Sequence, residues 1–270
     1  MKIAFIGGGN MAAALIGGLV ARDVAPASFV VVEPAALQRE TLRERFGVVA
    51  IESADADALR GAELCVLAVK PQQMRAAVSG LGAVLSEALV VSIAAGIRSG
   101  DVSRWLGGHR RIVRAMPNTP ALIGRGVTGL YAAKELSEVD RDRAARTMSA
   151  VGEVVWVDAE PALDAVTAVS GSGPAYVFLM MEAMQQAAGA LGLDERQARS
   201  LVLHTFAGAS ELALRSDEPV ALLRERVTSK GGTTAAALEV FEASPLRHIF
   251  VDALRAAERR GAELGEEFGK

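Results

Sequence analysis

The stretch Lys2-Ile-Ala-Phe-Ile-Gly-Gly-Gly-Asn-Met-Ala12, followed by small and aliphatic residues as far as Val20, decides how the rest of the chain is interpreted. Residues 2–6 are apolar and partly β-branched, which is typical of a buried parallel strand. Residues 13–20 have helical character. A strand, a glycine turn and a helix in this order give the context in which a G-x-G-x-x-[GA] motif predicts dinucleotide binding.

Each small residue of this turn has a physical role in that prediction. Gly7 allows a tight turn, Gly9 lets a pyrophosphate approach the backbone, and Ala12 lets the helix pack closely on the strand. The start of the helix offers unpaired N–H groups and a partial positive charge to the phosphates. A strand–helix turn without a ligand is the alternative, and the second strand that follows makes it less favoured. The predicted cofactor-binding residues of the turn are Gly7, Gly8, Gly9, Asn10, Met11 and Ala12.

Length and composition bound the class of protein. The chain has 270 residues, enough for one large domain or two smaller ones, and its 51% hydrophobic and 23% charged residues are ordinary for a globular protein. The net charge is −3 and no basic stripe with interleaved aromatic residues occurs, so no nucleic-acid partner is expected. Three scattered histidines and one cysteine, Cys65, give neither metal-ligand spacing nor an internal disulfide. We expect no metal, and we expect Cys65 to be an inert core residue.

The chain shows no secretory signal peptide at its start and no apolar run of about 20 residues that could span a membrane. We therefore expect a cytoplasmic protein without a membrane partner.

Strands and helices alternate through the first part of the chain. Further strands are predicted at residues 29–32, 47–51, 64–69, 89–93, 112–116, 127–131 and 154–157. This alternation favours an α/β, Rossmann-like dinucleotide-binding domain with a doubly wound, mostly parallel sheet over residues 1–158. Residues 159–270 have almost no strand pattern and predict a second, all-α domain.

The second strand ends at Glu33, where a dinucleotide fold places the group that reads the ribose. An acid at this position favours the free 2′-hydroxyl of NAD, whereas a nearby arginine favours the 2′-phosphate of NADP. Glu33 therefore argues for NAD, and Arg39 leaves NADP open. In the alternative interpretation Glu33 only ends a strand.

Three further stretches follow strands whose carboxyl ends should face the ligand. Small residues and prolines there would form firm edges for a flat nicotinamide ring. Lys70 could reach a ribose hydroxyl or a phosphate, and Asn118 could bond a ribose or a carboxamide. Turn formation alone is the alternative, because Pro and Asn are common turn residues. The stretches are Val69-Lys70-Pro71, Ala94-Ala95-Gly96 and Pro117-Asn118-Thr119-Pro120.

Two predicted helix starts in the all-α part combine hydroxyl groups with paired glycines. They are Ser170-Gly-Ser-Gly-Pro-Ala-Tyr176 and Thr228-Ser-Lys-Gly-Gly-Thr-Thr234. Backbone N–H groups and hydroxyls at a helix start form a site for a small anion. The second stretch has no acid in its first helical turn, which fits an anionic ligand. A threonine-capped helix after a glycine-rich loop is the alternative.

Taken together, these motifs closely resemble those of the pyrroline-5-carboxylate reductase family. The resembling stretches cover the chain from end to end in the order of the family, and the last two together are highly specific. They are Phe5 to Met11, Ala68 to Pro71, Ser92 to Gly96, Arg114 to Pro120, Ser170 to Tyr176 and Thr228 to Thr234.

The resemblance implies a dinucleotide-binding domain followed by an all-helical dimerisation domain. It implies reduction of 1-pyrroline-5-carboxylate, a cyclic imino acid, to L-proline with hydride from NADPH or NADH, the last step of proline synthesis. The helical domains of two subunits would interlock in a homodimer or a ring of dimers, with a substrate site drawn from both subunits.

The same resemblance assigns the site residues. Thr167 would lie near the ring nitrogen of the substrate as the catalytic residue. The nicotinamide half of the cofactor would be lined by Lys70, Pro71, Ala95, Gly96 and Asn118. The carboxylate of the substrate would be held by Ser229, Gly231, Gly232, Thr233 and Thr234.

The expected chemistry asks mainly for positioning, because a protonated cyclic imine is already a strong electrophile for hydride. No histidine is required, and His109, His204 and His248 are interpreted as structural. One rival is a 3-hydroxyacid dehydrogenase, whose catalytic lysine would have to be Lys230. Another rival is a nucleotide sensor without activity, which the second anion site disfavours.

Overall fold

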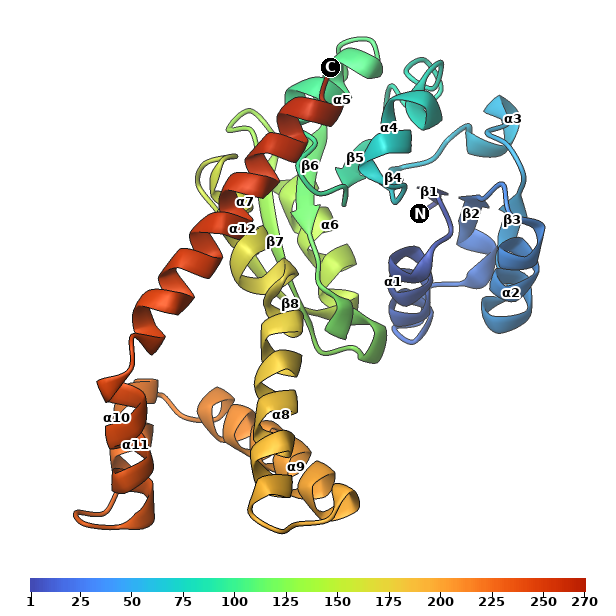
Figure 1. The fold of residues 1–270 in the computed structure, drawn as a ribbon. Helices are drawn as coiled ribbons and strands as arrows, with labels where there is room; N and C mark the ends of the chain where they lie inside the picture. Colours follow the sequence, from blue (N-terminus) through green and yellow to red (C-terminus); the bar gives the residue numbers. More distant parts are fainter. The chain divides into compact units, whose positions relative to one another are not determined.

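A computed structural model describes residues 1–270, and its elements are labelled in Figure 1. The chain forms two compact units, one of Met1–Ser172 with Leu254–Lys270 and the other of Gly173–Ala253. This division differs from the predicted one, because the end of the last helix returns to the first unit. The strand pattern carried no signal for that return. The functional division into residues 1–158 and 159–270 stays a prediction.

One eight-stranded sheet organises the first unit, in the order β3-β2-β1-β4-β5-β6-β7-β8. Pairing is parallel from β3 to β6, β7 runs antiparallel to β6, and β8 runs parallel to β7. The strand order reverses between β1 and β4, which makes this pair the topological switch point. The strands are β1 (Ile3–Ile6), β2 (Phe29–Val32), β3 (Val49–Ile51), β4 (Leu64–Leu67), β5 (Leu89–Ser92), β6 (Ile112–Met116), β7 (Gly126–Ala132) and β8 (Gly152–Trp156).

Alternate strand residues build two cores on opposite faces of this sheet. Ile3 and Phe5 belong to the core under α1 (Asn10–Val20), α2 (Ala36–Phe46) and α6 (Glu138–Met148). Ala4 and Ile6 belong to the core under α3 (Ala56–Leu59), α4 (Pro71–Val78) and α5 (Ser99–Trp105). Short 3₁₀ turns connect further elements at η1 (Pro26–Ser28), η2 (Thr119–Ile123) and η3 (Ser149–Val151). The predicted doubly wound α/β domain is confirmed.

A helical segment follows the sheet. It comprises α7 (Ala162–Val166) and a π-helical turn, η4 (Thr167–Gly171), and α8 (Gly173–Ala190) comes next. Gly129 of β7 lets α7 pack closely, since a Cβ there would lie 2.6 Å from Val166 Cγ1. The π turn belongs to the first unit, and α8 is the first helix of the second unit.

The second unit is all-helical, as predicted. It contains α8, α9 (Glu195–Leu214), α10 (Val220–Arg226), α11 (Thr233–Ala243) and the beginning of α12 (Leu246–Phe268). Helices α8 and α9 pack against each other. Only Ala198 and Val202 are buried in this unit, while large apolar side chains such as Phe178 and Leu179 are exposed.

Two findings bear on the expectations about composition. Cys65 is fully buried in β4, and burial raises the pKa of its thiol to about 12, as expected of an inert core residue. None of the helices combines the length and the apolar character that crossing a bilayer requires.

Candidate dinucleotide and substrate site

The glycine turn lies at the switch point between β1 and β4. Gly7 has a φ of 99°, and a Cβ there would lie 2.6 Å from the backbone oxygen of Ala68. Its N–H donates to the carbonyl of Val32 at 2.8 Å. Gly7 thus has to be glycine both for its backbone conformation and for the close approach of the β4 end.

The helix that follows this turn, α1, has no side-chain cap at its N-terminus. Gly9 is the N-cap of α1 without a side-chain cap, the first turn contains no acid, and a Cβ on Gly9 would meet nothing within 4 Å. Ala12 is fully buried against the sheet, as predicted. An exposed backbone at an uncapped helix N-terminus is the cradle that a pyrophosphate requires. The residues present therefore fit a dinucleotide.

Glu33 is linked directly to the glycine turn. Its Oε2 accepts from the N–H of Gly8 at 2.9 Å, and its Oε1 accepts from the N–H of Ala35 at 2.9 Å. The side chain of Gln38, which the sequence prediction missed, donates through Nε2 to the carbonyl of Gly8 at 2.6 Å. The bonds from Gly8 and Ala35 fix the carboxylate beside the turn, and the bond from Gln38 holds the turn itself, so Glu33 does more than end a strand.

The side chain of Arg39 already has hydrogen-bond partners within the protein. Its Nη1 donates to the carbonyls of Glu33 at 2.8 Å and Pro34 at 2.7 Å, and its Nη2 lies 3.5 Å from Glu52 Oε2. The side chain is only 13% exposed. Arg39 therefore stabilises the chain after β2, and its donors are directed at that chain rather than at solvent.

The ends of β4 and β5 lie beside the turn in the sheet. Helix α4 begins at Pro71 with Lys70 as its uncapped N-cap, and its first turn contains no acid. Ala68 donates its N–H to the carbonyl of Ile6 at 2.7 Å. Gly96 is buried with a φ of 79°, and Ala95 is half-buried. Ala68, Val69, Lys70, Pro71, Ala95 and Gly96 thus follow neighbouring strands at the carboxyl edge, where the sequence prediction expected them.

Asn118 follows β6 and has a structural task that the prediction did not include. Its Nδ2 donates to the carbonyl of Ser170 at 3.1 Å, and its Oδ1 accepts from the N–H of Val127 at 2.9 Å. The residue is 9% exposed. Asn118 thereby ties the π turn to the sheet, and one amide hydrogen remains available for a ligand.

Thr167 is the first residue of the π turn, a backbone form that is frequent at functional sites. Its Oγ1 donates to the carbonyl of Leu163 at 2.7 Å. The hydroxyl hydrogen is therefore in use, and the oxygen lone pairs remain to accept a hydrogen bond.

The stretch Ser170-Gly-Ser-Gly-Pro-Ala-Tyr176 is not the free helix start that the sequence suggested. The backbone is already π-helical through Gly171, and the N–H of Ser172 donates to the carbonyl of Thr167 at 2.8 Å. The N–H of Ser172 is therefore not free for an anion, and the anion site expected in this stretch stays a prediction.

The other predicted helix start is open. Helix α11 begins at Thr233 with Gly232 as its N-cap, without a side-chain cap and without an acid in its first turn. Gly231 has a φ of 71°, and a Cβ on Gly232 would lie 2.5 Å from Ser229 Oγ. Ser229, Thr233 and Thr234 are exposed. This corner of the second unit presents hydroxyls and backbone donors together.

A polar cluster that the sequence did not reveal joins α7 to the sheet. Glu160 accepts from Arg114 Nη1 at 3.2 Å and from the N–H of Ser99 at 2.6 Å, and Arg98 Nη2 lies 2.6 Å from Asp164 Oδ2. Burial lowers the pKa of Arg114, and the charge of Glu160 opposes that change. The cluster fixes the start of α7 and hence the turn that carries Thr167.

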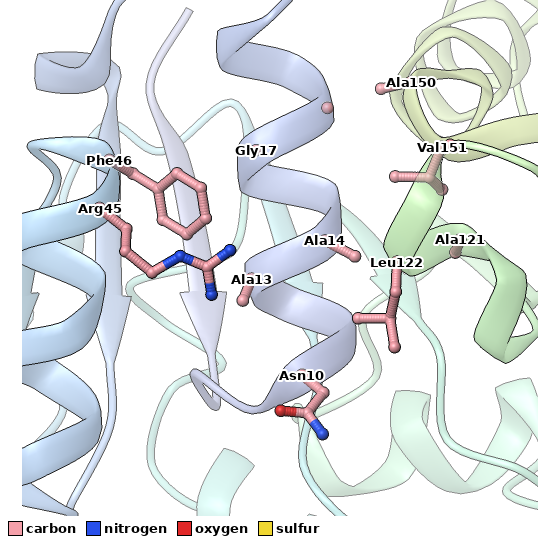
Figure 2. Close-up of a pocket in the computed structure, with 12 residues that line it drawn as sticks. Asn10, Ala13, Ala14, Gly17, Arg45, Phe46, Ala121, Leu122, Ala150 and Val151 are labelled. Carbon is pink, nitrogen blue, oxygen red and sulfur yellow. The ribbon is translucent and has the colours of Figure 1, made fainter.

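Figure 2 shows a cavity of about 180 Å³ that is not this site. Side chains of α1, α2, η2 and η3 line it, and Asn10 is the one predicted site residue among them. Its volume is below the roughly 300 Å³ of common ligand pockets.

The histidines and the candidate lysine lie outside these groups. His109 is 8% exposed with Nε2 at 3.2 Å from the carbonyl of Arg111, and burial lowers its pKa. His204 is exposed and bonds through Nδ1 to the carbonyl of Ser200 at 2.8 Å. Lys230 is exposed in the loop before α11. No group of three or more His, Cys, Asp or Glu side chains could hold a metal ion.

The sheet order, the switch point and the open glycine turn define a protein of the doubly wound, dinucleotide-binding class. Two family models match, "NADP oxidoreductase coenzyme F420-dependent" over residues 2–96 and "Pyrroline-5-carboxylate reductase dimerisation" over residues 160–264. A pyrroline-5-carboxylate reductase from Pseudomonas aeruginosa is 48% identical and covers 100% of this chain and 98% of its own. The chain belongs to the pyrroline-5-carboxylate reductase family.

Solved structures agree. A pyrroline-5-carboxylate reductase from Coxiella burnetii is 42% identical with a TM-score of 0.92, and covers 97% of this chain and 98% of its own. Pyrroline carboxylate reductase from Plasmodium falciparum, solved with NADP bound, is 28% identical with a TM-score of 0.85, and covers 98% of both chains. The rival 3-hydroxyacid dehydrogenase is therefore set aside, and the chain is an NAD(P)H-dependent oxidoreductase with a dimerisation domain.

Proposed function

We propose that the crevice outside β1, β4 and β5 holds NAD(P)H, and that the substrate site draws on two subunits, with Thr167 of one subunit near the ring and the start of α11 of the other at the carboxylate. As a member of its family, the protein reduces 1-pyrroline-5-carboxylate to L-proline in proline biosynthesis. When bound, NAD(P)H supplies the hydride for the imine carbon. The glycine turn and the first turn of α1 would bind its pyrophosphate, and Lys70, Pro71, Ala95 and Gly96 would line its nicotinamide half.

Thr167 orients the protonated imine. Its hydroxyl hydrogen is committed to Leu163, so its oxygen accepts from the imine N–H and does not donate a proton. This contact would favour the charged imine and fix the face of the ring that receives hydride.

The start of α11 binds the substrate carboxylate. The single observation that carries this assignment is an uncapped helix N-terminus, free of acids in its first turn, with Ser229 against Gly232. Exposed N–H groups and hydroxyls there match a carboxylate in charge and in hydrogen bonding. Ser229, Gly231, Gly232, Thr233 and Thr234 would share the contacts.

Glu33 favours NADH over NADPH. Its carboxylate is fixed by the N–H groups of Gly8 and Ala35 at the position that reads the ribose, so it can accept from a 2′-hydroxyl. A 2′-phosphate would face this negative charge, and Arg39 is engaged with backbone carbonyls.

The exposed apolar side chains of α8, α9 and α11 support an assembly in which two helical units interlock. A homodimer, or a ring of such dimers, would cover these surfaces. We place the assembly in the cytoplasm.

Crystals grown with L-proline test the substrate assignment. We expect the carboxylate of proline at the N–H groups of Thr233 and Thr234, with its ring nitrogen near Thr167. Steady-state kinetics of Ser229→Ala should show a higher KM for pyrroline-5-carboxylate at an unchanged Kd for NADH. Proline bound with its carboxylate away from residues 229–234 would contradict the assignment.

A further inference from the structure

The last helix, α12, contacts the loop after β5 through bare backbone. Gly261, Gly265 and Gly269 recur at four-residue spacing, so they share one side of the helix end, and all three are buried. A Cβ on Gly265 would lie 2.5 Å from the carbonyl oxygen of Gly96. A Cβ on Gly96 would lie 2.9 Å from the nitrogen of Gly265. No side chain separates the two segments.

This contact explains why glycine, which destabilises a helix, occurs at position 265. Glycine inside a helix is about 1 kcal/mol less favourable than alanine. At Gly265 the close approach of Gly96 requires it. One turn earlier, a Cβ on Gly261 would come no closer than 3.9 Å to Asp164, so alanine fits there.

The end of α12 is anchored to the neighbouring helices. Arg104 of α5 donates to the carbonyl of Gly269, and Arg75 of α4 donates to the carbonyl of Lys270 at 3.1 Å. Phe268 packs against the core under α4 and α5. Figure 1 shows the C-terminus beside α5. These two helices follow the strands whose ends carry Lys70, Pro71, Ala95 and Gly96.

We propose that Gly265 is a positioning residue for hydride transfer, which holds the Ala95–Gly96 loop against the nicotinamide half of the coenzyme. This inference rests on the cofactor assignment proposed above. The loop has no side chain at Gly96 to fix it, so the backbone of α12 supplies its outer support. Displacement of this loop moves the nicotinamide edge and leaves the glycine turn, which binds the pyrophosphate, in place.

The test compares Gly265→Ala with the matched control Gly261→Ala in the full-length protein. Fluorescence titration measures the Kd of NADH, and competition measures the Kd of ADP-ribose, which lacks the nicotinamide. We expect Gly265→Ala to weaken NADH binding at least fivefold and to lower kcat, with ADP-ribose binding unchanged. Gly261→Ala should match the wild type in all three quantities.

Arg104→Met provides a second variant that adds no steric clash, and it decides the case if Gly265→Ala does not fold by circular dichroism. It loosens the anchor at Gly269 and should weaken NADH binding more than ADP-ribose binding. Wild-type NADH affinity in a folded Gly265→Ala or, failing that, in Arg104→Met would overturn the proposal, and so would equal weakening of both ligands.

The binding readout also separates this inference from the proposed function. NADH that binds tightly to a wild type unable to reduce pyrroline-5-carboxylate would contradict the function and leave the positioning role intact. A wild type that binds ADP-ribose but gains no affinity from the nicotinamide would overturn the positioning role.

Discussion

The hydroxyl of Thr167 illustrates how a single hydrogen bond decides a chemical role. Because its hydrogen is directed to Leu163 at 2.7 Å, the oxygen can only accept from the substrate. An acceptor stabilises a protonated imine but cannot supply its proton. In the arrangement proposed above, the proton would come with the substrate from solvent, and the protein would contribute orientation.

Replacement of Thr167 tests that role. We expect Thr167→Ala to lower kcat roughly tenfold or more, because one hydrogen bond to a charged group contributes about 1.5–3 kcal/mol. Thr167→Ser should restore most of the rate, since it keeps the oxygen, and the Kd of NADH should be unchanged in both variants. Stopped-flow rates of NADH oxidation with pyrroline-5-carboxylate give the comparison. Wild-type kinetics in Thr167→Ala would remove this residue from the mechanism.

The charge of Glu33 should have a measurable effect on the choice between NADH and NADPH. Glu33→Gln keeps the shape and removes the charge, so the ratio of kcat/KM for NADH to kcat/KM for NADPH should fall on the order of tenfold, about 1.4 kcal/mol. Glu52→Gln is the control, since Glu52 is 77% exposed and only meets Arg39. An unchanged ratio in Glu33→Gln would show that this carboxylate does not select the coenzyme.

At the scale of elements, Asn118 connects a strand end to the π turn. Asn118→Ala leaves the half-buried N–H of Val127 and the carbonyl of Ser170 without these partners, and should cost about 1 kcal/mol or more of unfolding free energy. Because the turn carries Thr167, kcat should fall as well. Asn118→Asp keeps only the bond from Val127 and should give an intermediate kcat. A raised KM for NADH alone would indicate the ribose contact that the sequence suggested.

An ion pair between buried Asp140 and partly exposed Arg111 fixes α6 to the start of β6. Arg111 bonds Asp140 at 2.8 and 3.0 Å, and these bonds hold the pKa of Asp140 below its usual value of 3.8. A depressed pKa stabilises the fold above pH 3.8, and that contribution disappears as the pH falls through the lower value.

The effect of Asp140→Asn on stability should depend on pH, because the pKa of Asp140 is lowered in the folded state. At pH 7 the variant should lose about 1 kcal/mol, a modest amount because Arg111 is partly exposed. The difference from the wild type should shrink below about pH 4. Urea unfolding at both pH values measures it, with the exposed Asp142→Asn as control on the same helix. A loss that stays constant with pH would assign the effect to packing.

The sequence predicted the strands and helices better than it predicted how they connect and pair. All eight strands and the all-helical character of the second unit were expected, because hydrophobic periodicity and glycine or proline residues at element ends act locally. The antiparallel direction of β7 was not expected, since the direction of a strand depends on which strand it pairs with in the folded sheet. The π turn at Thr167 also has no local signature, and it engages the N–H of Ser172 that a free helix start would have left open.

At the scale of the molecule, the site residues show the same limit. Gly7, Gly9 and Gly232 could be proposed from the sequence because turns and helix starts restrict residue type, and each lies at a turn or a helix start. The contacts of Gln38 and Gly265 were not predicted because their partners, Gly8 and Gly96, lie far along the chain. The unit boundary differs for the same reason: α12 begins in one unit and ends in the other.

The second unit also indicates what the whole molecule needs for stability. With only Ala198 and Val202 buried, it has little core of its own, whereas Phe178 is 63% and Leu179 is 65% exposed on α8. Apolar area of this kind contributes about 25 cal/mol per Å² once another copy covers it. The Tm should therefore rise with protein concentration.

Phe178→Asp tests this dependence on a second copy. Sedimentation equilibrium should show a dimer or larger assembly for the wild type and a shift toward monomer for the variant, because a charge would be buried without a partner. Reductase activity should fall with the assembly if the substrate site draws on two subunits. Val139→Asp, at a 64% exposed position on α6, is the matched control and should stay assembled and active. A fully active Phe178→Asp monomer would show that one chain is sufficient for catalysis and that the exposed faces of α8 serve another purpose.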